Sequence, residues 1–479
     1  MIETLASIYG PSYASTIVYM LQSTEYRAGP YLKWYWRTNN FSRVARRKLL
    51  DRTRAADLLL IALRTGMILQ LAAGLGLFIA GLSGRATGGV EFGLALMLSY
   101  PVVWAHLVVV PLLFGRWFIA VPKEKQAVLR SKSVFKKHSA IKIAVAGSYG
   151  KTTMKEILLT VLGEGKKVAA TPANKNVAPS HAIFAKKLDG DEDILIIEFG
   201  EGAPGDVKRF SATTQPNIGV ITGLAPAHLD RYKTVEAAGR DIFSLADYLN
   251  DQEIYVNTES PSLKSFVKPK HHTYDSSGVM GWKVEDVKLE PNKASFTLKK
   301  GERVLKIKSE LVGRHQVGPL ALAAALADKL GLTKEQIEAG AAKTVPFEHR
   351  MQPRLLNGAW IIDDTYNGNI EGIRAGLALL KELKAGRKIY VTPGLVDQGK
   401  ENERVHKEIG QLIAEAKPDQ VVLMRNSVTN WIEQGLEESG YKGELLIKTD
   451  PLEFYSNLDQ FIAAGDVVLM QNDWTDNYR

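Results

Sequence analysis

Residues 141–153, with the sequence IKIAVAGSYGKTT, constrain the fold of this chain more than any other segment. The apolar run 143–146 predicts a buried strand, and a glycine-bounded turn separates it from a helical pattern that continues to Val161. A turn of this kind binds phosphate, because its glycines let backbone N–H groups approach an anion and the helix N-terminus adds a favourable dipole. The segment therefore predicts a nucleotide-binding α/β domain.

The turn has the form G-x-x-G-K-T-T. It is shorter than the usual Walker pattern, because Val145 stands where that pattern has its first glycine. We expect Lys151 to reach the terminal phosphates of ATP and the Thr152 hydroxyl to ligate Mg²⁺. The predicted phosphate-binding residues are Gly147, Ser148, Tyr149, Gly150, Lys151, Thr152 and Thr153. On this segment alone, a glycine-rich turn without a ligand remains the structural alternative.

Composition narrows the class of protein. The 479 residues predict two to four domains, and the absence of cysteine excludes disulfides, thiolate metal sites and a cysteine nucleophile. The formal charge is +9, and much of the excess lies in the first 140 residues. This distribution favours contact with a membrane surface. No signature of nucleic-acid binding is present, so no nucleic-acid partner is expected.

Two long apolar segments precede the phosphate-binding turn, at about 58–82 and 92–121. Each is long enough to cross a bilayer core, and the short link 83–89 joins them as a hairpin. Basic clusters flank the hairpin on both sides, at 43–54 and 123–137, so both ends are expected in the cytoplasm. We predict a two-helix transmembrane hairpin at 57–122 and cytoplasmic catalytic domains. A buried hairpin in a soluble domain is the alternative.

Residues 1–56 combine aromatic and basic side chains, most clearly in YLKWYWR at 31–37. Such a mixture is typical of a segment at the membrane interface, with aromatic rings at headgroup depth and cations on anionic lipid. We predict an interfacial segment here. A solvated helix with a few packed aromatics is the alternative.

From about residue 140 the pattern changes to short apolar runs that alternate with amphipathic helices, which is typical of a mostly parallel, doubly wound sheet. A β-rich insert at 282–309, a helix at 320–330 and a boundary near residue 345 follow. We predict a P-loop-type domain at 139–345 and a Rossmann-like domain at 346–479. The predicted strands are 142–146, 167–170, 193–197, 218–222, 254–257, 360–363, 388–392, 420–424 and 466–470.

Polar residues follow several of these strands, where ligands bind in open α/β sheets. Glu198 ends one strand, and a magnesium role is natural for it beside a P-loop. His228 follows the strand 218–222, although a histidine there is often only packed. The segments 171–176 and 362–369 carry amides, acids and an aromatic that suit a nucleotide. For each, a capping group or a solvated turn is the alternative.

Taken together, these stretches resemble the Mur ligase family, the ATP-dependent amide-bond ligases of peptidoglycan precursor synthesis. The resemblance runs from about residue 141 to the C-terminus and is nearest to the branch that adds D-alanyl-D-alanine. The matching segments are 147–153, TPANKN at 171–176, EFG at 198–200, AHL at 227–229, GRH at 313–315, HR at 349–350 and DDTYNGN at 363–369.

The resemblance implies a reaction in which ATP phosphorylates a carboxylate and an amine attacks the acyl phosphate. Its implied partners are a muramyl-peptide acceptor, UDP- or lipid-linked, and an amino acid or dipeptide, with ATP and Mg²⁺ as cofactors. Lys151 and His228 are implied as catalytic, and Thr152, Glu198 and His228 as metal ligands. The implied nucleotide contacts beyond the turn are Asn174, Asn176, Arg350, Asp364, Tyr366 and Asn367, and residues 393–397 are expected near the incoming amine.

Three departures from the family pattern stand out. Gly239 occupies the position where many members carry a carbamylated lysine that bridges two magnesium ions, and the adjacent Arg240 cannot ligate a metal. The adenine-side motif H-N-x-x-N is changed to HQVGP at 315–319. The membrane hairpin stands where the family has its UDP-sugar-binding domain, which suggests a lipid-linked acceptor as a hypothesis.

Two other functions remain open from the sequence. One is a membrane-associated ligase of the poly-γ-glutamate type. The other is a non-catalytic nucleotide-binding scaffold, which the loss of the bridging lysine favours and the retention of Lys151, Thr152 and Glu198 opposes.

Overall fold

The computed structural model describes residues 6–24, 26–43, 50–173, 175–225, 229–366, 368–395 and 398–472. The chain divides into two compact units, Met1–Gln126 and Ala127–Arg479.

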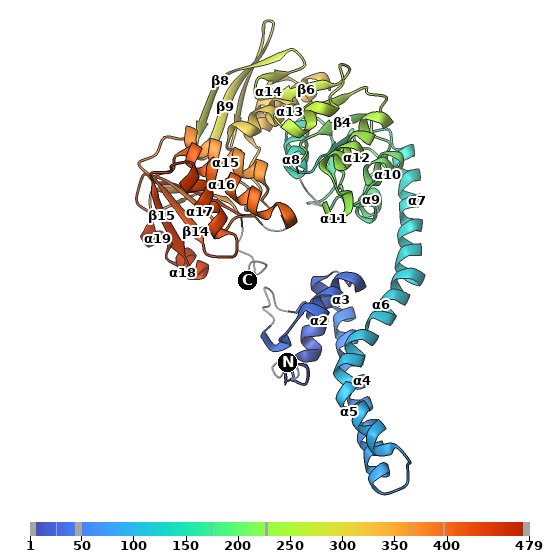
Figure 1. Cartoon of the computed structure of the whole chain (residues 1–479). Helices are drawn as coiled ribbons and strands as arrows, with labels where there is room; N and C mark the ends of the chain where they lie inside the picture. Colours follow the sequence, from blue (N-terminus) through green and yellow to red (C-terminus); the bar gives the residue numbers. More distant parts are fainter. Residues whose placement is uncertain are drawn as a thin grey trace. The chain divides into compact units, whose positions relative to one another are not determined.

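The first unit is helical. Its described elements are α2 (Tyr13–Ser23), α3 (Ala28–Arg37), η1 (Phe41–Arg43), α4 (Arg54–Leu82), α5 (Gly89–Leu107), α6 (Val109–Gly115) and η2 (Arg116–Ala120), and α7 (Val121–Lys137) leads out of it. The long helices α4 and α5 pair as a hairpin (Figure 1), where Gln70 Nε2 of α4 donates to the Leu96 carbonyl of α5 at 3.1 Å. Among the described residues, two helices are long and apolar enough to cross a membrane: Arg54–Leu82 and the extended helix Gly89–Lys137.

The aromatic residues near the N-terminus divide between the core of this unit and its surface. Tyr31 and Tyr35 are buried, and the Tyr31 hydroxyl donates to the Ala105 carbonyl of α5 at 2.8 Å. Trp36 is 72% exposed. Helical periodicity explains the split, because side chains four positions apart share a face whereas adjacent ones do not. The interfacial role of residues 1–56 stays a prediction, and the basic residues Arg46, Arg47 and Lys48 lie outside the described part of the chain.

The second unit contains two sheets, which are both visible in Figure 1. The larger has ten strands in the order β10-β9-β8-β7-β6-β5-β4-β1-β3-β2, parallel from β6 to β2 and antiparallel from β6 to β10. Its strands are β1 (Ile141–Ala146), β2 (Val168–Ala170), β3 (Ile194–Glu198), β4 (Ile218–Ile221), β5 (Ile254–Asn257), β6 (His272–Asp275), β7 (Gly278–Val279), β8 (Trp282–Glu290), β9 (Lys293–Lys300) and β10 (Arg303–Ser309).

Helices cover both faces of the larger sheet because its central strands are apolar on both sides. One core joins the sheet to α8 (Lys151–Leu162), α13 (Val317–Lys329) and α14 (Lys334–Ala342). The opposite core involves the end of α7 with α9 (Ala178–Ala185), α10 (Asp206–Thr214) and α12 (Val235–Tyr248). Short elements α11 (Leu229–Tyr232), η3 (Pro261–Phe266) and η4 (Arg314–Gln316) complete this part.

The second sheet has six strands in the order β11-β12-β16-β13-β14-β15, parallel except for β11. Its strands are β11 (Gln352–Leu356), β12 (Ala359–Asp364), β13 (Lys388–Thr392), β14 (Gln420–Met424), β15 (Glu444–Lys448) and β16 (Val467–Gln471). Its helices are α15 (Ile370–Glu382), η5 (Gly399–Glu401), α16 (Asn402–Ala416), α17 (Thr429–Glu438), α18 (Pro451–Ser456) and α19 (Leu458–Phe461).

The predicted α/β fold, preceded by an apolar helical hairpin, is confirmed, and most predicted strands lie within one or two residues of their observed bounds. Four strands were not predicted: β6, β7, β11 and β15. β11 and β15 are sheet edges that are only partly buried, and β11 contains Pro353, so neither has the continuous apolar run of a central strand.

Candidate active site

The phosphate-binding turn lies between β1 and α8, as the sequence predicts. Gly150 (φ +77°) and Gly147 (φ +144°) adopt backbone conformations that disfavour side chains, and a Cβ at Gly147 would lie 2.4 Å from Thr222 Oγ1. The Ser148 N–H donates to the Gly223 carbonyl at 2.8 Å, which ties the turn to the end of β4. The backbone conformation therefore favours glycine at both positions, and at Gly147 the lack of space for a side chain requires it as well.

Lys151 begins α8, and its ammonium lies among oxygen atoms. It hydrogen-bonds the Gly147 carbonyl, lies 3.3 Å from the Ser148 carbonyl and is 2.7 Å from Glu201 Oε2. The Ser148 Oγ is buried and has no hydrogen-bond partner among the described residues. An unpaired hydroxyl beside a lysine and a helix N-terminus fits the phosphates of ATP.

Glu198 ends β3 beside the start of α8. Its Oε1 accepts from Thr152 Oγ1 and from Asn176 Nδ2, each at 3.1 Å. The Glu198 backbone N–H donates to Thr171 Oγ1 at 3.0 Å, so the loop after β2 is joined to the same strand end. Glu198 Oε2 is buried and has no hydrogen-bond partner among the described residues. A hydroxyl and a carboxylate oxygen that accepts no hydrogen bond from the described residues are the hard donors that Mg²⁺ prefers.

The remaining turn residues are positioned by packing. Tyr149 packs its ring over Gly223, and burial raises the pKa of its phenol to about 12, so it is protonated at neutral pH. Thr153 is half-buried in the first turn of α8.

A second group of predicted residues lies in the smaller sheet. Asp364 ends β12, where its carboxylate accepts from Gln471 Nε2 at 2.7 Å and from the Met351 N–H at 3.2 Å. Burial raises the pKa of Asp364 to about 6, against the opposing effects of these hydrogen bonds and of Arg350. The Arg350 guanidinium lies 4.7 Å from the centre of the Tyr366 ring, a cation–π contact.

The loop after β13, residues 393–395, is fixed by a neutral histidine. His406 Nε2 accepts from the Leu395 N–H at 3.0 Å, and its Nδ1 lies 2.6 Å from the Asn402 carbonyl. Burial lowers the pKa of His406, which keeps the ring uncharged. Asn426 donates to the Pro393 carbonyl at 2.6 Å.

Family models match both sheets of the second unit. The Mur ligase middle domain matches residues 145–327, and the Mur ligase glutamate ligase domain matches residues 349–473. These matches cover the phosphate-binding turn, Glu198, Arg350 and Asp364. The chain belongs to the Mur ligase family.

Similar proteins agree with this assignment. The UDP-N-acetylmuramoyl-tripeptide–D-alanyl-D-alanine ligase of Mycobacterium leprae is 26% identical over 362 residues, which are 69% of this chain and 70% of that protein. The ligase of the same name from Bacillus subtilis is 24% identical, over 69% of this chain and 72% of its own length. This Mur ligase is therefore an ATP-dependent enzyme that forms peptide bonds.

Solved structures show the same fold. MurF of Acinetobacter baumannii superposes with a TM-score of 0.63 at 20% identity, covering 73% of this chain and 77% of that one. MurF of Thermotoga maritima, solved in complex with ADP, gives 0.62 at 22% identity, over 73% of this chain and 80% of that one.

The departures from the Mur ligase pattern have structural counterparts. A Cβ at Gly239 would lie 2.4 Å from the Phe266 ring, so the space of a side chain is already filled, and Arg240 is exposed. Asp241, on the same helix, accepts from the Tyr232 hydroxyl at 2.7 Å, and burial raises its pKa. His315 is half-buried, and desolvation lowers its pKa to about 4. Its Nδ1 has no hydrogen-bond partner among the described residues.

Four predicted positions are not described: Asn174, His228, Asn367 and Asp397. Asn369 of the same motif proves to be a helix cap, because its side chain accepts from the Gly372 N–H at the start of α15.

Sequence reasoning missed three residues of this Mur ligase site: Lys155, Glu201 and Gln471. Lys155 had a usable signal, since it stands four positions after Lys151 and therefore on the same face of α8. Glu201 follows Glu198 by three residues in a loop, where no periodicity applies. Gln471 ends β16, which pairs with β12 in a register that places it beside Asp364.

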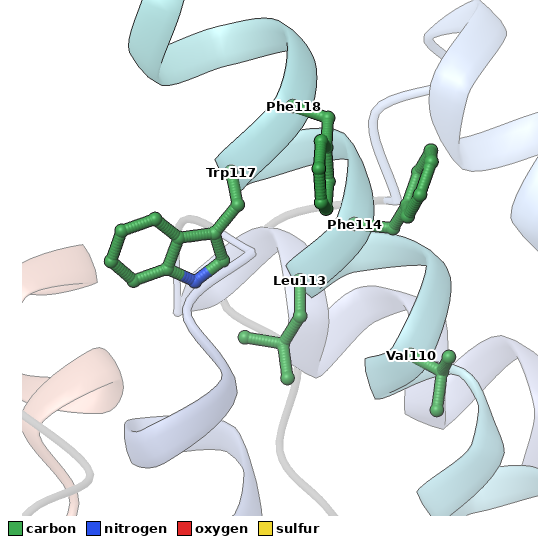
Figure 2. Close-up of a pocket in the computed structure, with 5 residues that line it drawn as sticks. All are labelled: Val110, Leu113, Phe114, Trp117 and Phe118. Atoms are coloured by element: carbon green, nitrogen blue, oxygen red, sulfur yellow. The ribbon is translucent and has the colours of Figure 1, made fainter.

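An open hollow of about 510 Å³ lies elsewhere, on the surface of α6 and η2. Figure 2 shows its five lining residues on one helical stretch: Val110, Leu113, Phe114, Trp117 and Phe118. It has no titratable side chain and so differs in chemistry from the ligase site.

Proposed function

We propose that this Mur ligase joins D-alanyl-D-alanine, or a closely similar amine, to the terminal carboxylate of a muramyl peptide in cell-wall synthesis. The observation that carries the proposal is the grouping of Lys151, Thr152 and Glu198 at the carboxyl edge of the larger sheet. The names of the similar ligases support the substrate assignment.

In this proposal Lys151 and the backbone amides of residues 147–150 stabilise negative charge on the phosphoryl group as it moves from ATP to the acceptor carboxylate. The amine then attacks the acyl phosphate, and the tetrahedral intermediate collapses to an amide and phosphate. Arg350, Asp364, Tyr366 and Asn367 contact the nucleotide from the C-terminal domain, and Asn174 and Asn176 from the loop after β2. His228 contributes to the catalytic centre.

Thr152 and Glu198 are the described residues that would hold Mg²⁺, with His228 as the third expected ligand. The fit rests on the Thr152 hydroxyl and on Glu198, whose Oε2 has no hydrogen-bond partner among the described residues. When bound, the ion neutralises charge on the phosphates. A second, lysine-bridged ion has no support, because Gly239 packs against Phe266.

We also propose that residues 57–122 anchor the enzyme in the membrane, with the ATP-binding domain at 139–345 and the C-terminal domain at 346–479 in the cytoplasm. Many large apolar side chains of the hairpin are exposed, among them Leu58, Ile68, Leu75 and Phe92. Exposed apolar surface on this scale needs a partner, and acyl chains supply one. The aromatic hollow in Figure 2 suits the same surroundings.

A membrane anchor favours an acceptor that is itself lipid-linked, because both then share one surface. Phosphate release by the full-length protein in detergent tests this, with ATP, Mg²⁺, D-alanyl-D-alanine and either UDP-linked or lipid-linked muramyl tripeptide. A dipeptide-sized mass gain with either acceptor supports the ligase. Equal turnover of both acceptors would contradict a preference for the lipid-linked acceptor. The absence of phosphate release with both acceptors would contradict the proposed amine or the proposed polymer.

Replacement of Lys151 by alanine tests the catalytic centre. We expect Lys151→Ala to lower turnover by at least 10³-fold, since a preorganised charge opposite the transferring phosphoryl group is removed. The measurement is phosphate release under saturating substrates. Lys186→Met, an exposed lysine of the same domain, is the control and should retain wild-type turnover. Retention of turnover by Lys151→Ala would contradict the proposed role.

A further inference from the structure

Lys155 is a fully buried lysine in the core of the candidate site. Its side chain has 0% exposure, and its ammonium hydrogen-bonds the carbonyl oxygens of Thr171, at 2.8 Å, and of Ala173. It also lies 3.0 Å from Glu156 Oε1 and 3.7 Å from Glu198 Oε2. A buried ammonium is costly unless oxygen atoms surround it, and here four do.

These contacts join three separate elements through one charge: helix α8, the loop after β2 and the end of β3. The loop needs such a restraint, because Ala173 has φ +46°, a left-handed conformation that non-glycine residues rarely adopt. The same loop supplies Asn176, whose amide donates to Glu198 Oε1 at 3.1 Å. Lys155 therefore acts on Glu198 both directly and through the loop.

We propose that Lys155 is a positioning residue for the metal–nucleotide site. It holds Glu198 and the loop after β2 in the arrangement that accepts a divalent cation beside Thr152. The inference rests on the proposed function, which gives Glu198 its role as a metal ligand. Lys155 itself touches neither the nucleotide nor the metal in this proposal.

The charges around Lys155 suit this role. Glu156 lies closer to the ammonium than Glu198 does, at 3.0 Å against 3.7 Å, and offsets part of its charge. Lys155 can therefore orient Glu198 without leaving a bare cation beside a divalent ion. Glu198 Oε2 keeps no hydrogen-bond partner among the described residues and stays available as a ligand.

The test measures metal binding directly. Mn²⁺ is titrated into full-length protein in detergent with saturating ATP and followed by electron paramagnetic resonance. We expect Lys155→Met to weaken Mn²⁺ binding 10- to 100-fold, the range found when groups that orient metal ligands are removed. ATP affinity in EDTA should fall much less than Mn²⁺ affinity, because the phosphate-binding turn is untouched and only the nucleotide contacts proposed for the loop after β2 are disturbed. Lys186→Met is the matched control and should leave both affinities unchanged.

A double-mutant cycle separates positioning from general damage. If Lys155 acts through Glu198, the pair Lys155→Met and Glu198→Gln should bind Mn²⁺ no more weakly than Glu198→Gln alone. Lys155→Gln keeps a hydrogen-bond donor for the loop carbonyls and should also weaken Mn²⁺ binding. It replaces Lys155→Met in this test if Lys155→Met does not fold. Unchanged Mn²⁺ affinity, or equal loss of ATP affinity in EDTA, would overturn the inference. Failure of the wild-type protein to bind Mn²⁺ with ATP would instead overturn the proposed function.

Discussion

At the scale of single residues, the candidate site holds several charges in buried positions, where each has a measurable consequence. Asp364 is kept partly protonated by burial, and Lys151 is kept close to a carboxylate. The Asp364 carboxyl affects protein stability and the Lys151–Glu201 pair affects nucleotide binding, so both features can be tested without measuring turnover.

Asp364 predicts a pH dependence of stability. Its pKa is about 6 in the folded chain and 3.8 in the unfolded chain, so between these values the folded state binds the extra proton. The stabilisation of the folded state by this bound proton is therefore fully present below pH 3.8 and is lost as pH rises through 6. We expect Asp364→Asn to be more stable than wild type at pH 7.5, by about 2–3 kcal/mol, and to show little difference near pH 4.

The measurement for Asp364 is the thermal unfolding temperature of nucleotide-free protein across this pH range. Asp459→Asn removes the same charge from an exposed position and is the control. A constant difference between wild type and Asp364→Asn at all pH values would contradict the burial argument.

Glu201 predicts an effect on nucleotide affinity. Its carboxylate lies 2.7 Å from the Lys151 ammonium, and incoming phosphates must compete with it for that lysine. Glu201→Gln leaves Lys151 less well compensated in the empty site. We therefore expect ATP to bind about fivefold more tightly in EDTA, a gain of about 1 kcal/mol.

Isothermal titration of ATP checks the Glu201 prediction, with Glu164→Gln as the control because Glu164 pairs with Lys343 instead. Weaker binding by Glu201→Gln would mean that Glu201 helps to organise the site for ATP.

At the scale of elements, the helices of the C-terminal domain pack through very close backbone contacts. A Cβ at Gly435 of α17 would lie 2.1 Å from the Lys407 carbonyl of α16 and 3.0 Å from Gly410 Cα. The neighbours are backbone atoms, which cannot rotate away. The crossing of α16 and α17 thus depends on the absence of a side chain at Gly435.

We expect Gly435→Ala to destabilise the C-terminal domain by about 1–3 kcal/mol, because overpacking forces the two helices apart. Faster hydrogen exchange in α16 and α17 is the measurement. Gly372→Ala in α15 is the matched control, since a Cβ at Gly372 would lie 3.8 Å from its nearest neighbouring atom. This control substitution should stabilise the C-terminal domain slightly. Equal exchange in Gly435→Ala and wild type would contradict the packing argument.

At the scale of the whole molecule, the apolar hairpin and the ligase domains differ in the chemistry of their surfaces. The helices α4 and α5 carry exposed leucine, isoleucine and phenylalanine side chains, whereas the ligase domains bury theirs in four cores around two sheets. This difference is what the proposed membrane anchor requires, with the hairpin in contact with acyl chains and the ligase domains in water.

Because the chain has no cysteine, the proposed membrane topology can be tested with single introduced thiols. Thr87→Cys lies in the link between α4 and α5, and Ser133→Cys lies in α7, both at exposed positions. If both flanks of the hairpin are cytoplasmic, a membrane-impermeant maleimide should label Thr87→Cys in intact cells and Ser133→Cys only after lysis. The unmodified chain is the control. Labelling of both, or of neither, in intact cells would contradict the hairpin topology.

Sequence alone determined the features that a short window contains. The turn between β1 and α8, the central strands and the long apolar helices were predicted because each has a strong local signal: glycines, a continuous apolar run or 20 or more apolar residues. The same local reading placed Thr152 and Glu198 at one edge of the sheet, because Thr152 lies in the first turn of the helix that follows β1 and Glu198 ends the parallel strand β3.

Only the tertiary structure decided the contacts that depend on strand order and on chain reversal. The pairing of β12 with β16 brings Gln471 to Asp364, and the loop after β2 brings two carbonyls to Lys155. Glu201 reaches Lys151 across 50 residues of sequence. No sequence periodicity relates such partners to one another. The local sequence pattern therefore identifies charged residues of this site, whereas the strand order and loop paths of the fold determine which of them pair.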